Sequence, residues 1–338
     1  MSLWAALAVL GTAPIASAQN RADSWRAAFE KVESDPDAAV EHALNAHEGD
    51  SLDWGFEKEK GFEAEMPWLA SARQLAPLLT DRAAAAAEAG DGERAAQLLA
   101  SSLYLSRDVG DSTMFAELVE AGVISLIESE AEPTLGDLKA SDLSPLVAAL
   151  DTCEGSVDMA SAVERERDMM IQWLEQQPTF PMQVFKAIGA DEPGAEMKAQ
   201  FEAFWANAAK KNAMLTALRQ GYNDATVALK KKQLNAKLRA TAIMGQRNAQ
   251  AESPYGLLGQ LLLPNYEAVA AADVRGKTSF ALLEAAVAQI SGGDDARQKV
   301  RDPATNRPFN FEKIGEGFRL TSDMTDGAGE KMTLTVGN

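Results

Sequence analysis

The chain has 338 residues, 46% of them hydrophobic and 7% aromatic, and a net charge of −18. This length is enough for one large or two ordinary domains, and the six Trp and twelve Phe argue against a disordered chain. The charge is uneven, because residues 19–160 carry 29 acidic and 10 basic side chains. Such a surface is typical of a solvated acidic exterior and repels nucleic acid, so we expect no nucleic-acid partner.

The first eighteen residues differ from the rest of the chain. They contain the apolar stretch LWAALAVLGTAPIASA, which is too short to span a bilayer comfortably, and end in Ala16-Ser17-Ala18, a signal-peptidase-like site, although no basic residue precedes the stretch. We expect a signal peptide over 1–18 and a periplasmic or secreted protein; the alternative is a buried N-terminal helix. No later run reaches eighteen apolar residues, so we expect no membrane span.

Residues 19–176 predict an acidic region of helical hairpins. Asp35 and Pro36 have the types expected at a helix N-cap and first helical position, and Pro67 suits the first turn of another helix. Two helices joined by a Gly-Asp-Gly turn follow over 68–111, and a third begins at a cap supplied by Ser112 or Thr113. We expect a connector over 131–145 and helix again over 145–176.

The turn between the two helices of 68–111 resembles that of a tetratricopeptide hairpin. Ala83, Ala87 and Ala95 are small enough to let the helices approach closely. No clean 34-residue repeat is present, so a generic antiparallel helix pair is the preferred interpretation, with an irregular solenoid as the alternative.

Residues 177–194 contain Pro178, Pro181 and Pro193 and predict a connector, because proline opposes a continuous helix. Residues 195–292 predict a long-helix region. One helical pattern runs from 195 to about 250, and Asn265 caps a last helix that Gly292-Gly293 closes.

Residues 293–338 change from helical to strand periodicity. The runs PFNFEKI, GFRLTS and KMTLTV alternate apolar and polar residues between Gly or Asp turns. We expect a two- or three-stranded antiparallel unit packed on the last helix, because such a unit is unstable alone. The fold class is therefore mainly α, with packed helical hairpins and a small C-terminal β unit.

The tail resembles the C-terminal region of type II secretion major pseudopilins, in which a DP-x-G-x-P-x-x-Y segment leads to a Y-S-x-G-x-D-G loop. It is still more similar to the ends of uncharacterised, exported, Ala- and Leu-rich helical proteins of environmental, planctomycete-like bacteria. The similarity covers about 68–130 and 255–330 and is carried in the tail by Asp302-Pro303, Pro308-Phe309, Gly317-Phe318, Leu320, Ser322 and Asp326-Gly327.

The tail departs from the pseudopilin pattern in two places. SGGDD replaces the Tyr-rich stretch expected after the helix, and Thr321-Ser322-Asp323-Met324 replaces YSxG. The N-terminus also lacks the pilin pattern, so we do not expect pilin-like polymerisation. In pseudopilins the corresponding loop holds calcium, and here the candidate oxygen ligands are Ser322, Asp323, Asp326 and Glu330. An Asp/Gly-rich hairpin turn is the preferred alternative.

Catalytic motifs are sparse in this sequence. The two histidines, His42 and His47, are five residues apart and fall on different helix faces, and no G-x-S-x-G or nucleotide-binding loop is present. We name no catalytic residue and no cofactor other than the candidate calcium. Glu164, Glu166 and Asp168 alternate with arginines, which predicts a solvated ion-pair face.

Two further groups of residues have two interpretations each. Trp54, Trp68, Trp173 and Trp205 are expected in the core, with a ligand groove as the alternative. A basic cluster is expected to pack on the acidic half of the chain, with an external anion such as a lipid headgroup or peptidoglycan as the alternative. It consists of Lys210, Lys211, Arg219, Lys230, Lys231, Lys232, Lys237, Arg239 and Arg247.

These observations favour an exported, non-enzymatic interaction or scaffold protein of the bacterial envelope, with a protein or envelope polymer as its partner. The first alternative is a carboxylate-based hydrolase of cell-wall or polysaccharide material, recognisable by two facing carboxylates in a deep cleft. The second is a secretion-associated protein with a pseudopilin-like calcium loop. The sequence leaves the oligomeric state open.

Overall fold

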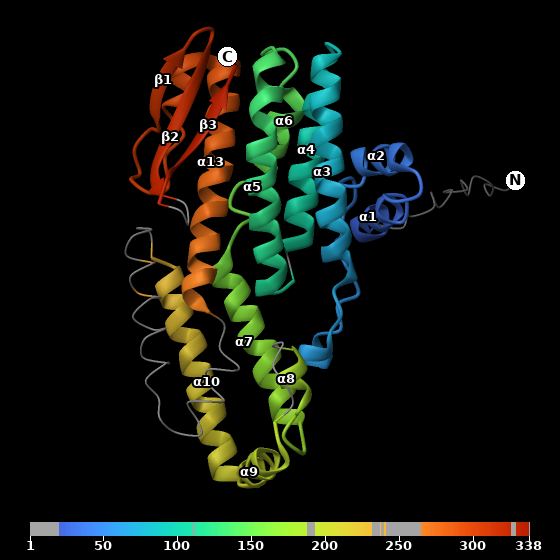
Figure 1. The fold of residues 1–338 in the computed structure, drawn as a ribbon, viewed down its shortest axis with the longest axis vertical. Coiled ribbons are helices and arrows are strands. Elements are labelled where there is room, and N and C mark those ends of the chain that lie inside the picture. Colours follow the sequence, from blue (N-terminus) through green and yellow to red (C-terminus); the bar gives the residue numbers. More distant parts are fainter. Residues whose placement is uncertain are drawn as a thin grey trace, which may run out of the picture.

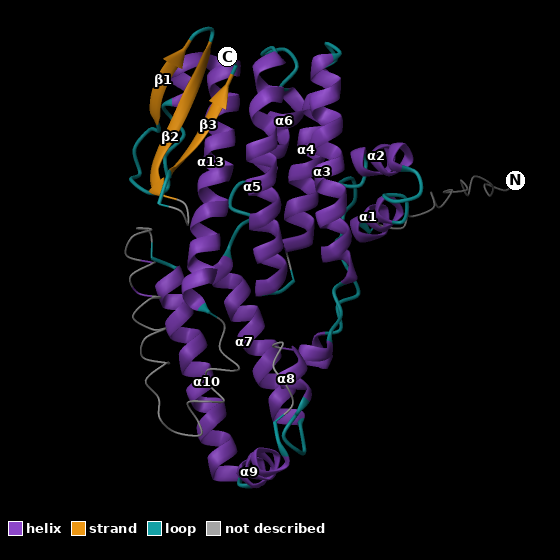
Figure 2. Ribbon diagram, viewed as in Figure 1, coloured by secondary structure: helices purple, strands orange, loops and turns teal. Residues whose placement is uncertain are grey.

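The computed structural model describes residues 20–110, 112–187, 193–231, 237, 240, 265–325 and 329–337. Within these residues the fold is mainly α-helical and ends in a three-stranded antiparallel sheet, which confirms the predicted fold class (Figure 2). The predicted signal peptide lies outside the described residues. None of the described helices is long and apolar enough to cross a membrane.

The elements form a row, as Figure 1 shows, in which the sheet, α13, α5, α4 and α3 follow one another from left to right. Helices α7 to α10 lie below this row, beyond the lower ends of α13 and α5. The helices are α1 (Arg21–Phe29), α2 (Pro36–Leu44), the 3-10 helix η1 (Lys58–Glu63), α3 (Pro67–Glu88), α4 (Gly92–Gly110), α5 (Met114–Asp137), α6 (Ser144–Cys153), α7 (Met159–Gln176), α8 (Gln183–Ala187), α9 (Ala195–Ala206), α10 (Ala208–Leu229) and α13 (Tyr266–Arg297). The strands are β1 (Asn310–Ile314), β2 (Gly317–Thr325) and β3 (Lys331–Val336).

Side-chain caps fix the starts of the predicted helices. Asp35 accepts a hydrogen bond from the backbone N–H of Ala38, with Pro36 directly after the cap. Thr113, rather than Ser112, caps α5, and Asn265 caps α13. These caps confirm the predicted starts of three helices. Such starts can be predicted because local hydrogen bonds determine them.

Two helix boundaries before residue 177 differ from those expected. The predicted connector 131–145 is wrong in its first half, since α5 continues to Asp137 with Pro133 inside it. The burial of Ala131 and Leu135 offsets the hydrogen bond that this proline removes. The predicted helix 145–176 is two helices, separated at Gly155, which has a positive φ of 73°.

The predicted long helix from 195 is interrupted at Asn207. This residue ends α9 and caps α10 by accepting from the backbone N–H of Lys210, so one polar side chain redirects the chain. The part of the prediction beyond residue 231 lies outside the described residues, except for positions 237 and 240.

Two groups of buried apolar residues form the interior. The larger joins α1 to α6 with α13 and the sheet. The smaller joins the second half of α7 to α8, α9 and the first half of α10. The predicted connector 177–194 contributes Phe180, Val184 and Phe185 to this second group, so the chain is packed there.

The basic cluster packs partly on α7. Lys230 pairs with Glu164 at 2.7 Å, and Arg219 pairs with Glu175. Lys211 donates to the carbonyl of Gln177 at 2.9 Å. Glu164, Glu175 and Gln177 lie beyond residues 19–160, which carry the acidic excess, and Lys237 pairs with Asp273 of α13, so packing on the acidic half of the chain stays a prediction. Lys232, Arg239 and Arg247 lie outside the described residues.

The sheet has the order β1-β2-β3, and its inner face packs on α13 and α5 through Leu320, Leu334 and Val336. Gly317, at the start of β2, pairs with Ile314 across the hairpin. A Cβ atom at Gly317 would lie 2.0 Å from the carbonyl oxygen of Val336, so glycine permits this contact between β2 and β3.

We expect Gly317→Ala to lower the free energy of unfolding by about 2 kcal/mol or more, because the clash is with backbone. Gly122→Ala is the matched control, since Gly122 is exposed within α5 and a Cβ there meets nothing. It should stabilise the protein by about 0.5–1 kcal/mol. Urea unfolding of both variants checks this, and equal stabilities would contradict the close packing of β2 and β3.

Candidate functional sites

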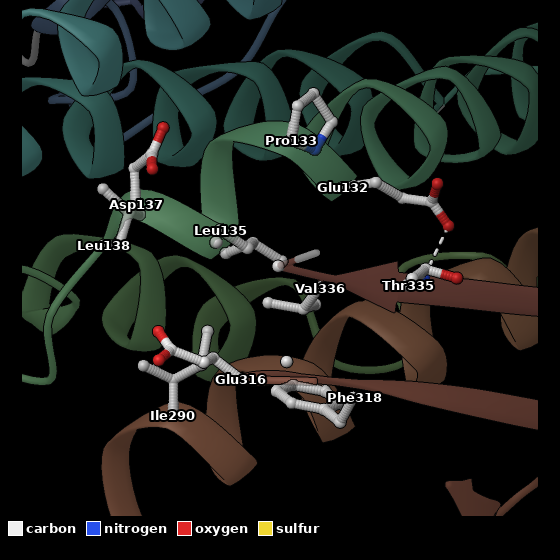
Figure 3. Close-up of a pocket in the computed structure, with 13 residues that line it drawn as sticks. Glu132, Pro133, Leu135, Asp137, Leu138, Ile290, Glu316, Phe318, Thr335 and Val336 are labelled. Atoms are coloured by element: carbon white, nitrogen blue, oxygen red, sulfur yellow. Dashed lines mark hydrogen bonds between the residues drawn. The ribbon is translucent and has the colours of Figure 1, made fainter. Parts of the chain in front are cut away.

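The larger candidate site is a groove between the C-terminal half of α5 and the sheet. It has a volume of about 760 Å³. Figure 3 shows α5 on one side, α13 on the other and the ends of β2 and β3 between them. The residues that line it are Glu132, Pro133, Leu135, Gly136, Asp137, Leu138, Ile290, Glu316, Gly317, Phe318, Thr335, Val336 and Gly337.

The walls of the groove are held together by contacts between α5 and β3. The Glu132 carboxylate accepts a hydrogen bond of 2.6 Å from the backbone N–H of Thr335, drawn as a dashed line in Figure 3. A Cβ at Gly136 would lie 3.0 Å from the backbone of Gly337, so the helix and strand approach closely here. Glu132 therefore satisfies an N–H of β3, which is an edge strand of the described sheet.

The groove combines apolar walls with charge of one sign. Leu135, Ile290, Phe318 and Val336 supply apolar surface. Among the described lining residues, the charged side chains are all carboxylates, from Glu132, Asp137 and Glu316. Such a lining favours a ligand with cationic and apolar groups.

The smaller candidate site is a polar cavity of about 270 Å³ at the other end of α5. It lies where α1, the end of α4, the start of α5 and the start of α7 meet. Its lining residues are Arg21, Leu52, Arg107, Asp108, Glu117, Glu120, Ser156, Asp158, Ser161 and Arg165.

Asp108 connects the elements around this cavity. One carboxylate oxygen accepts from Arg21 Nε at 3.0 Å and from Trp25 Nε1 at 2.9 Å, and the other accepts from Arg107 at 2.6 and 2.8 Å. The Asp108 carbonyl accepts from Trp54 Nε1 at 2.8 Å. The carboxylate is fully buried, so these charge-assisted bonds compensate its loss of water.

Glu117 and Asp158 join the start of α5 to the start of α7. Glu117 accepts from the backbone N–H of Asp158, and its other oxygen lies 3.6 Å from Arg165. Burial raises the pKa of Glu117 to about 7, although this hydrogen bond and the arginine oppose the rise. Burial opposes ionisation of Asp158 too, but hydrogen bonds from Ser161 hold the pKa of Asp158 below its usual range.

The carboxylates of Glu117 and Asp158 already have structural roles. Both Asp158 oxygens accept hydrogen bonds from Ser161 as the cap of α7, and Glu117 holds the peptide N–H of that cap. A hydrolase needs two facing carboxylates that remain available to substrate and water. The hydrolase hypothesis stays a prediction.

The structure does not bring the candidate calcium ligands Ser322 and Asp323 together. They are neighbours on β2 and point to opposite faces of the sheet. Ser322 is buried and donates to Asp302 at 2.9 Å, whereas Asp323 is exposed and pairs with Lys331 at 2.8 Å.

Asp326 lies outside the described residues, and Glu330 is exposed beside β3. No group of three or more His, Cys, Asp or Glu side chains suited to a metal ion is found in the part of the chain that the structure describes. The calcium loop stays a prediction.

Asp302 gives the Asp302-Pro303 motif of the tail a structural role. Its carboxylate accepts from Ser322 Oγ, from the backbone N–H of Asp323 and from that of Ala304, each at 2.9 Å. Asp302 therefore ties the segment before β1 to the middle of β2.

The four tryptophans of the sequence prediction, Trp54, Trp68, Trp173 and Trp205, are buried. Trp54 and Trp68 stack with ring centroids 5.3 Å apart and border a cavity of about 380 Å³, while Trp173 and Trp205 lie in the second apolar group. His47 stacks on Tyr104 at 4.1 Å, and His42 is exposed. Core packing thus accounts for most of the tryptophan surface.

The predicted solvated face of α7 is solvated only in part. Glu164 and Asp168 form ion pairs at the surface, as expected. Arg165 instead reaches Glu117 in the polar cavity, and burial raises the pKa of Glu166 to about 6. Alternating charge in the sequence does not reveal which of these side chains face another helix.

Sequence reasoning missed the buried acids of α5, two of which, Glu117 and Glu120, line the polar cavity. Glu117, Glu120 and Glu128 are buried on α5, although glutamate is usually exposed. Their spacing of three and eight residues was the available signal, because it repeats on one helical face together with Ile124 and Ala131.

Comparisons with protein-family models, with curated proteins and with solved structures find no match to this chain.

We expect Asp108→Asn to lower the free energy of unfolding by about 3–5 kcal/mol, because Arg21 and Arg107 lose a buried counter-charge. Asp37→Asn is the control, since Asp37 pairs with Arg82 at the surface and should cost at most about 1 kcal/mol. Urea unfolding measures both. A loss for Asp108→Asn as small as that of the control would show that Asp108 does not hold these elements.

Glu128 should make stability depend on pH. Burial and the neighbouring Glu132 raise its pKa from 4.5 to about 7, against a hydrogen bond from Ser279. Between these two values the folded protein binds more protons than the unfolded chain. The stabilisation is therefore complete below pH 4.5 and is lost as pH rises through 7.

Glu128→Gln removes this titration and keeps an acceptor for Ser279. At pH 8 it should be more stable than the parent by up to about 2–3 kcal/mol, with no such gain at pH 5. Glu130→Gln, an exposed change on the same helix, should show no pH-dependent difference. Urea unfolding at both pH values measures this, and an equal gain at both would exclude Glu128 as the cause.

Proposed function

We propose that this protein is a non-enzymatic interaction or scaffold protein whose groove binds a basic, partly apolar segment of a partner protein. One observation carries this proposal: the described charged residues that line the groove are all carboxylates, and they stand around apolar walls. A protein segment supplies both matching features when lysine or arginine alternates with aliphatic residues.

The dimensions of the groove support a peptide-sized occupant. Its volume of about 760 Å³ is within the range of ligand sites and leaves room for several side chains. The apolar walls provide contact area, while Asp137 and Glu316 select for positive charge and against acidic segments. Glu132 is engaged with Thr335, so its contribution is partly structural.

The proposal includes export. It rests on the apolar segment that ends in Ala16-Ser17-Ala18, which resembles a signal peptide. In the periplasm or outside the cell, the partner would be another envelope or secreted protein.

The test uses the double variant Asp137→Asn/Glu316→Gln and a fluorescent peptide of alternating Lys and Leu. We expect the parent protein to bind this peptide, and the double variant to bind it about 10-fold more weakly, because two opposite charges are lost. An acidic peptide in which Glu replaces Lys should not bind. Fluorescence anisotropy at low and moderate salt measures the affinities.

The matched control is Glu88→Gln/Glu130→Gln, which removes the same two charges from exposed positions outside the groove. It should bind the basic peptide as the parent does. An equal loss of affinity in both double variants would mean that net charge alone attracts the peptide, and the groove would not be the site.

A further inference from the structure

We infer that the polar cavity at the start of α5 is a binding site for a small zwitterion of free amino-acid size, with its ammonium group directed inward and its carboxylate directed outward. This inference is independent of the proposed function, because the cavity and the groove lie at opposite ends of α5 and share no lining residue.

The cavity has a positive rim and a negative floor. The side chains of Arg21, Arg107 and Arg165 are 21%, 20% and 36% exposed. Glu117 and Glu120 are almost completely buried, with 2% and 1% of their surface exposed. A molecule that enters therefore passes arginines first and meets carboxylates at depth.

Two buried polar atoms in the lining point to an occupant that accepts hydrogen bonds. Arg165 Nε and Ser156 Oγ are shielded from solvent, and neither has a hydrogen-bond partner among the described residues. The nearest acid to the Arg165 guanidinium is Glu117, at 3.6 Å, which is too long for a hydrogen bond. Buried donors are normally satisfied, so a ligand carboxylate or water is expected here.

The floor of the cavity suits an ammonium group. Glu117 and Glu120 lie one turn apart on α5 and both line the cavity. The backbone of α4 leaves room for the second carboxylate, since a Cβ at Gly110 would lie 1.8 Å from Glu120 Oε2. Asp108 also lines the cavity, and its carboxylate accepts hydrogen bonds from Arg21, Trp25 and Arg107.

The two layers of charge select against simpler ligands. A lone anion at the rim would bind Arg165 but would be repelled by Glu117 and Glu120 below it. A lone cation would be repelled by the arginines of the rim before it reached these glutamates. A small zwitterion places each charge beside its opposite at both levels and brings no net charge into the cavity. The volume of about 270 Å³ fits a molecule as small as glycine, alanine or serine.

The experiment measures binding of glycine, L-alanine and L-serine to the full chain by isothermal titration calorimetry and by the shift of Tm. L-Alanine methyl ester, which lacks the carboxylate, and N-acetyl-L-alanine, which lacks the ammonium, serve as matched probes. We expect at least one free amino acid to bind and to raise Tm, and both blocked derivatives to bind at least about 10-fold more weakly.

Arg165→Gln and Ser156→Ala should each weaken this binding about 10-fold, because each removes one donor to the ligand carboxylate. Arg167→Gln is the control on the same helix, since Arg167 pairs with Asp168 and Asn223 outside the cavity. Unchanged circular dichroism would show that the variants are folded.

Three results would overturn the inference. Binding of N-acetyl-L-alanine as tight as that of L-alanine would indicate a simple anion site, and equal binding of the methyl ester would indicate a cation site. No heat and no Tm shift with any of the three amino acids at millimolar concentration would mean that the cavity holds only water.

Discussion

The fold depends on how the buried and half-buried carboxylates of α5 find partners. Taking an ionised carboxylate out of water costs several kcal/mol, so each one must be hydrogen-bonded, ion-paired or protonated. Each pairing also fixes a neighbouring element: Glu117 holds the start of α7, Glu128 accepts from Ser279 of α13, and Glu132 binds the backbone of β3. The polar requirement of one helix thereby determines where three other elements pack.

These hydrogen bonds can form because the backbone of α5 lies close to those of α13 and β3. Where α13 crosses α5, a Cβ at Gly276 would lie 2.9 Å from that of Ala121, so the two helices are in contact through small residues. At the far end of α5, Gly136 meets the backbone of Gly337. Larger residues at either place would separate the elements and lengthen the hydrogen bonds that Glu128 and Glu132 accept.

Local signals in the sequence predicted much of the fold, whereas the sites depend on contacts between distant segments. Caps such as Asp35, Thr113 and Asn265 act within four residues, and strand alternation is equally local, so both were readable. The break at Asn207 was missed because its flanks keep a helical pattern. The burial of Glu117 was missed because its partners lie more than forty residues further along the chain.

The two candidate sites differ in how their charge is balanced, and this difference separates the kinds of ligand they suit. The groove has apolar walls, and its described charged residues are all carboxylates, so their negative charge can attract an external cation. The size of the groove suits part of a larger molecule. The polar cavity carries both signs, and Asp108 alone already neutralises part of its arginine charge. A nearly neutral site gains little electrostatic binding energy from a charged macromolecule. It gains most from a small ligand that places a negative group at the arginines and a positive group at the glutamates.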